Sequence, residues 1–165
     1  MDRHVSFDLE IADRTEGILP KDDYTYLLGA SLFVFEKVNT FVVENLGHAG
    51  LTGEHDWYHL IDAGQRSYVC LIGEHIDRKL GTDIAGRFDR LLDERNRIVH
   101  GFAATYSCEQ VLGTKTKHRK NDLANSDKQH IITREEMKKF IADCMDLNIR
   151  LDDVRDRLLG RTRVS

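Results

Sequence analysis

The sequence has little proline, few cysteines and no long uninterrupted apolar run, and each shortage excludes a class of protein. Pro20 is the only proline in 165 residues, a composition that favours helices because proline breaks helix interiors. No apolar run approaches the ~20 residues of a membrane span, and the N-terminal MDRHVSFDLE lacks the apolar stretch of a signal peptide. The three cysteines, Cys70, Cys108 and Cys144, are far apart and odd in number, which favours free thiols in a reducing cytoplasm over a disulfide framework.

Several enzyme motifs are also missing. The chain has no P-loop, G-x-S-x-G, C-x-x-C, H-E-x-x-H or glycine-rich nucleotide motif. Its formal net charge of −4 counts against a protein that coats nucleic acid, although a local basic patch is compatible with that charge. What is there, 41% hydrophobic and 32% charged residues, is typical of a soluble globular chain, and residues 1–165 are expected to form a single domain with a real core.

Apolar residues recur at helical spacing in four segments, and they predict a mainly α fold, an up-and-down four-helix bundle. The first three helices are expected at about 22–46, 56–80 and 83–100. Thr133 and Glu136 form a capping box that opens the last helix. That helix carries an apolar seam three and four residues apart: Met137, Phe140, Cys144, Leu147, Leu151, Val154 and Leu158.

Two segments do not fit the helical pattern. Residues 101–132 have no helical period and richer β-formers at their ends, so we expect a small β-hairpin or structured loop between the third and fourth helices. Residues 1–19 form an N-terminal extension, in which the alternation of Val5, Phe7, Leu9 and Ile11 predicts a short strand.

The first helix has more apolar residues than one buried face needs. Phe33, Val34 and Phe41 lie off its main stripe. Such a helix is either central in its fold or covered on a second side by another subunit.

The segment RNRIVHGF, residues 95–102, gives the third helix an unusual end. Arg95 falls in the middle of its apolar stripe, which consists of Phe88, Leu91, Leu92, Ile98, Val99 and Phe102. A guanidinium there must pair with a carboxylate or line a water-filled cleft; Glu36, Glu44 and Asp77 are the candidate partners. Asn96 and His100 are i,i+4 neighbours, so the amide can orient the imidazole. Gly101 suits the C′ position, which puts His100 at the carboxyl end of the helix.

This pattern resembles a known family. Arg-Asn, three residues and then His, on the third helix of a small four-helix bundle, is similar to the R-x4-6-H signature of the HEPN superfamily (higher eukaryotes and prokaryotes nucleotide-binding domains). The resemblance covers roughly residues 20–160, whereas residues 1–19 have no counterpart. One branch of the family carries a modified tyrosine two residues after the histidine. Phe102 stands there, so that form of regulation is not expected.

The resemblance implies a metal-independent, cytoplasmic endoribonuclease of the toxin or antiviral-defence type, without a cofactor and with RNA as its substrate. The ribose 2′-OH would attack the adjacent phosphate, with Arg95, Asn96 and His100 as the catalytic residues. Histidine can exchange a proton near neutral pH, and an arginine fork can clamp phosphate oxygens. Since one motif supplies one histidine, the family implies a homodimer with two motifs at one cleft. An antitoxin or regulatory protein is a further expected partner. The alternatives are a catalytically silent bundle that binds or regulates, and a helical metalloenzyme.

Two other clusters bear on these alternatives. His55 and His59 have the i,i+4 spacing of metal ligands and Glu54 lies beside them, whereas His75 on the second helix reads as a core histidine; no metal site is predicted. The only dense basic run is GTKTKHRK. Such a run is typical of a solvated hairpin tip, and in an RNA-binding protein it would contact phosphates. Its candidate RNA-binding residues are Lys115, Lys117, Arg119 and Lys120.

Overall fold

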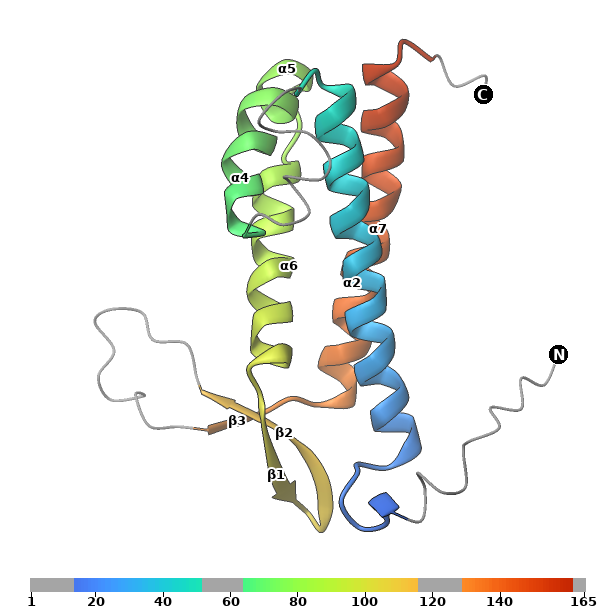
Figure 1. Ribbon diagram of the computed structural model, residues 1–165, viewed down its shortest axis with the longest axis vertical. Helices are drawn as coiled ribbons and strands as arrows, with labels where there is room; N and C mark the ends of the chain where they lie inside the picture. The colour runs from blue at the N-terminus through green and yellow to red at the C-terminus, as the bar shows by residue number, and fades with distance from the viewer. Residues whose placement is uncertain (1–13, 52–63, 116–128, 162–165) are drawn as a thin grey trace, which may run out of the picture.

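The computed structural model describes residues 14–51, 64–115 and 129–161. It is mainly helical, with a small antiparallel sheet at one end of the helices (Figure 1). The predicted strand around Val5–Ile11 lies outside the described residues, as does the predicted beginning of the second helix at 56–63.

Two long helices run side by side through the molecule (Figure 1). They are α2 (Asp22–His48) and α7 (Arg134–Leu158). α2 begins after Pro20 with Asp22 and Asp23 in its first turn, where carboxylates favour the helix dipole. α7 opens with the predicted capping box: Thr133 Oγ accepts from the Glu136 amide, and Glu136 accepts from the Thr133 amide. The predictions of both helices are confirmed.

The shorter helices complete the helical layer. α4 (Arg66–Ile72), the π-helical turn η2 (Gly73–Asp77) and α5 (Arg78–Leu80) follow one another without a break, and α6 (Ile84–Val99) packs against them. Gly81 adopts φ 67° between α5 and α6, a left-handed conformation that suits glycine. Asp77 then accepts hydrogen bonds from the first two amides of α6, those of Ile84 and Ala85.

Four aromatic rings join these helices at the centre of the core. Phe35 of α2 lies 6.0 Å from Phe88 of α6 and 6.2 Å from Phe140 of α7, measured between ring centroids. Tyr68 of α4 lies 6.3 Å from Phe88. All four are buried. Because each ring comes from a different helix, burying them together fixes how the helices pack.

The sheet has the order β1-β2-β3, with β1 (Phe102–Tyr106), β2 (Glu109–Lys115) and β3 (Gln129–Ile131) antiparallel to their neighbours. It lies between α6 and α7 in the chain, so the expected hairpin is confirmed and gains a third strand. The Tyr24 hydroxyl fastens the sheet to α2: it donates to the Ile132 carbonyl at 2.8 Å and accepts from the Leu112 amide at 3.0 Å.

α2 is more apolar than expected. An 18-residue window in it has a mean hydropathy of 1.4, so by length and composition this helix could cross a membrane, and the expectation that no run approaches a span is wrong. The core helix of a soluble protein passes the same test. Such a core helix is mostly buried, whereas 28% of this window is buried here, on the face of α2 that packs against α6 and α7.

Candidate functional site

The motif residues lie at the carboxyl end of α6, beside the sheet. Arg95 and Asn96 are in the last turns of the helix. His100 is its C-cap, as predicted, and its amide donates to the Asn96 carbonyl at 3.0 Å. The imidazole is exposed, and no other side chain in the described part of the chain hydrogen-bonds it. A titratable group therefore stands open to solvent at the point where the helix meets β1.

Arg95 is paired, which is one of the two outcomes that its place on the apolar stripe allowed. Its Nη2 lies 3.3 Å from Glu36 Oε1 on α2, and the side chain is only 24% exposed. Its Cζ lies 5.7 Å from the centroid of the Phe35 ring. The Nε is buried and makes no hydrogen bond within the described residues. The guanidinium therefore contacts both a carboxylate and a ring, while its Nε donor stays unused among the residues that the structure describes.

Asn96 does not orient the imidazole as expected. Its Oδ1 instead accepts a hydrogen bond from Arg95 Nη1 at 3.2 Å. The reason is competition: a carbonyl oxygen beside a guanidinium forms a charge-assisted bond, which is stronger than a bond to a neutral ring. In this arrangement Asn96 positions Arg95, and His100 is positioned by the backbone alone.

Gly101 ends the helix for a reason other than the one expected. Its φ lies outside the left-handed region that a C′ glycine adopts. A Cβ at this position would instead lie 3.1 Å from the Ile98 carbonyl oxygen, 3.3 Å from that of Gly113 and 3.4 Å from that of Arg97. Glycine avoids these close contacts, two of them with carbonyls of α6 itself and one with β2, which passes beside the turn between α6 and β1.

Of the basic run, Lys115 is exposed at the end of β2. The other three predicted RNA-binding residues, Lys117, Arg119 and Lys120, lie outside the described residues. The described ranges contain no cluster of three or more His, Cys, Asp or Glu that could hold an ion. His75 is half-buried in η2, and His55, His59 and Glu54 are not described.

A cluster of charged residues between α6 and α7 escaped the sequence reasoning. Glu94 and Arg97 from α6 face Glu136 and Lys139 from α7 around a cavity of about 160 Å³ with an apolar floor. Burial raises the pKa of the Glu94 carboxyl above its ordinary value. His130 Nε2 lies 2.6 Å from Glu136 Oε1. No sequence signal links the cluster, since helix periodicity does not say which faces of α6 and α7 meet.

Burial tends to raise the pKa of the Glu136 carboxyl, but hydrogen bonds outweigh it and the pKa is lowered. The backbone amide of Thr133, the His130 ring and the Thr133 hydroxyl all favour the ionised form. The capping box therefore begins α7 and also places the Glu136 carboxylate beside the His130 ring.

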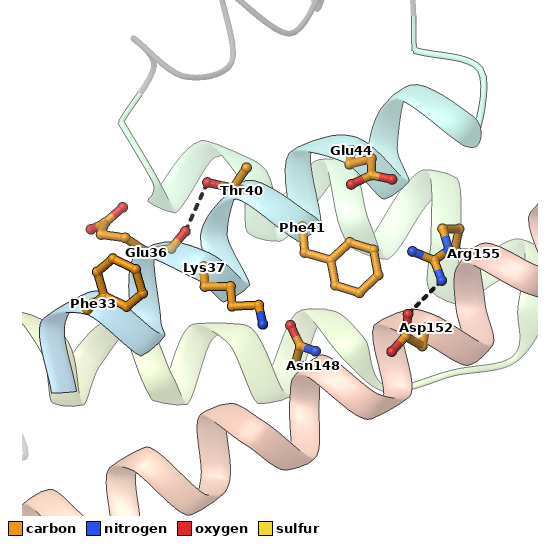
Figure 2. A pocket seen from close by; sticks show the side chains of 9 residues that line it. All are labelled: Phe33, Glu36, Lys37, Thr40, Phe41, Glu44, Asn148, Asp152 and Arg155. Atoms are coloured by element: carbon orange, nitrogen blue, oxygen red, sulfur yellow. Dashed lines mark hydrogen bonds and ion pairs between the residues drawn. The ribbon is translucent and has the colours of Figure 1, made fainter. Parts of the chain in front are cut away.

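A second hollow follows the outer side of α2 and α7 (Figure 2). It has a volume of about 620 Å³. The side chains that line it carry charges of both signs beside two aromatic rings: Phe33, Glu36, Lys37, Thr40, Phe41, Glu44, Asn148, Asp152 and Arg155. Arg155 lies over the Phe41 ring at 5.1 Å and bonds Asp152. Glu36, the partner of Arg95, is at one edge of this groove.

In comparisons with known proteins, no family model matches the chain, and no curated protein or solved structure matches it either.

Proposed function

We propose that the protein is a metal-independent endoribonuclease of the HEPN type, built on an up-and-down four-helix bundle with the sheet inserted before the last helix. It would act in the cytoplasm as a toxin or antiviral-defence effector, under the control of an antitoxin or another regulatory protein. Lys115 and the basic residues that follow it would contact RNA phosphates.

The observation that carries the proposal is the arrangement at the end of α6. A guanidinium oriented by Asn96 and an exposed imidazole lie within five residues of one another. Cleavage through the 2′-OH needs a proton acceptor, a proton donor and positive charge on the phosphorane. Arg95 supplies the charge and His100 exchanges a proton.

The second proton-transfer group would come from another copy of the chain. The outer face of α2 supports such a homodimer, since Phe33 is 76% exposed there. Tyr26, about two helical turns earlier on the same face, is also exposed. The adjoining groove is lined by residues of both charges, among them Lys37 and Glu44 from successive parts of α2 (Figure 2). A two-fold axis brings the same patch of both copies together, so a surface with both signs of charge is self-complementary. The dimer would bring the two 95–100 segments near its axis.

A second candidate is a catalytically silent bundle of the same kind that binds or regulates a partner. The Arg95–Glu36 pair favours it, because a guanidinium that already contacts a carboxylate and the Phe35 ring can have a purely structural role.

Cleavage of labelled RNA in EDTA tests the proposal. Because the substrate's own 2′-OH attacks, we expect cleavage without metal, a 2′,3′-cyclic phosphate end and no cleavage of DNA. His100→Ala should abolish activity. His48→Ala is the matched control, since His48 also lies at a helix carboxyl end. Activity that disappears on chelation and returns with a divalent metal would exclude this mechanism, and an inactive, folded wild type would favour the silent bundle.

A further inference from the structure

One face of the sheet presents two aromatic side chains to solvent immediately after the motif. Phe102 is 39% exposed and Tyr106 is 60% exposed. They share a face of β1, since side chains alternate along a strand. The register places Gly113 opposite Phe102 and Lys115 two residues further along β2 on the same face.

The Phe102 ring is held in place by Gly113. A Cβ at Gly113 would lie 2.7 Å from Phe102 Cε2 and 2.9 Å from Cζ, so the ring occupies the space that any other side chain would fill. A ring packed on a glycine in a neighbouring strand loses little freedom when a second flat group stacks on it. Its exposed part is therefore preorganised for stacking.

We propose that this face, made of Phe102, Tyr106 and Lys115, binds single-stranded RNA, with one base stacked on each ring and a phosphate near Lys115. The rings are four residues apart, or ~13 Å along the strand, too far to enclose a single base. Because Phe102 is two residues from His100, its base is the one next to the cleaved phosphate. This inference deepens the proposed function and rests on it for the position of the cleavage.

The size and chemistry of the face favour RNA over a protein partner. Three strands ~4.8 Å apart and about 16 Å long offer roughly 240 Å², well below the ~800 Å² that each partner contributes to a stable protein interface. A strand of RNA needs only flat apolar rings for its bases and a cation for its phosphates, and sheets with exposed aromatics bind single strands in this way. Beside Tyr106 a groove of about 510 Å³ lies between the sheet and the start of α7, lined by Val111, Gln129 and Ile131 together with Glu109, Arg134 and Glu135. Glu109 stands opposite Tyr106 and is paired with Lys21 and Arg134. That groove gives the strand a path across the sheet.

The test measures binding in the uncleaving His100→Ala background. An oligoribonucleotide that contains 2-aminopurine reports stacking by loss of its fluorescence. Phe102→Leu keeps an apolar side chain over Gly113 but removes the ring, so affinity should fall roughly 5- to 150-fold, the equivalent of about 1–3 kcal/mol for one stacked base. Phe102→Tyr should keep the affinity. Thr105→Ala is the matched control, since Thr105 is exposed on the opposite face of β1.

The outcomes separate this inference from the proposed function. Suppose that wild type cleaves RNA and that the Phe102→Leu variant, shown to be folded by its circular dichroism spectrum, binds and cleaves RNA equally well. The stacking face is then refuted and the proposed ribonuclease activity stands. If wild type never cleaves but the oligonucleotide binds and depends on Phe102, the face stands and the ribonuclease fails. A face that holds a second copy would instead show as a change of oligomeric state in Phe102→Leu by light scattering, and would overturn the RNA assignment.

Discussion

If Arg95 clamps phosphate, Glu36 competes with the substrate for its guanidinium. The pair is only partly buried, since Arg95 is 24% and Glu36 49% exposed. An ion pair this exposed contributes roughly 0.2–1 kcal/mol, and the contact with Phe35 about 0.5–1 kcal/mol. If Arg95 were a fully buried structural ion-pair partner, its loss would cost roughly 3–5 kcal/mol of stability. The partial exposure of both side chains lowers that cost to about 1–2 kcal/mol.

Three variants use this difference. Glu36→Gln should cost under about 1 kcal/mol of stability and should speed RNA cleavage up to about fivefold, because ~1.4 kcal/mol corresponds to a factor of ten in rate. Arg95→Lys keeps the charge but loses the planar fork, so it should stay folded and lose most activity. Asp89→Asn is the control: Asp89 of α6 is 40% exposed and pairs with Arg66 of α4 at 2.9 Å, and it lines neither the groove nor the motif. This control variant should have nearly the wild-type melting temperature and the wild-type rate of RNA cleavage.

Circular dichroism melts and cleavage of labelled RNA in EDTA, run on the same preparations, decide the matter. A Glu36→Gln variant that melts far below wild type and cleaves no faster, beside an active Arg95→Lys variant, would refute phosphate binding by Arg95. The role of Arg95 would then be structural.

Three further outcomes are expected. Phe33→Glu places a charge on the most exposed ring of α2 and should turn a homodimer into a monomer by light scattering while the melt stays cooperative; a wild type that is already an active monomer at micromolar concentration contradicts the dimer. Gly101→Ala should lower the free energy of unfolding by about 1–3 kcal/mol, because backbone carbonyls crowd the new methyl group; urea titration measures this, and an unchanged midpoint contradicts the packing argument. The lowered pKa of Glu136 contributes stability above the carboxyl's unfolded pKa that is lost as pH falls through the folded value. Glu136→Gln should therefore flatten the acid side of the stability curve, whereas Thr133→Val, which keeps the carboxylate, should flatten it less.

Much of the fold was readable from local patterns. The periodicity of α2, α6 and α7 is a property of each segment, and the capping box at Thr133 involves residues three apart, so both could be read without knowing what packs against them. The change to β-formers after Gly101 predicted a hairpin for the same reason. The third strand was not predicted, because β3 is only three residues long and residues 116–128 separate it in the sequence from its partner β2.

The candidate site shows where local reading ends. The sequence by itself determined that Arg95 lies on an apolar stripe, that it must either pair with a carboxylate or line a water-filled cleft, and that His100 ends a helix, because helix geometry alone relates these positions. Only the tertiary structure decided which carboxylate pairs with Arg95, that Asn96 turns to the guanidinium, and that Gly101 makes room for β2. These contacts depend on how α2, α6 and the sheet pack together, and the residues that meet there are far apart in the chain, so no local pattern encodes them.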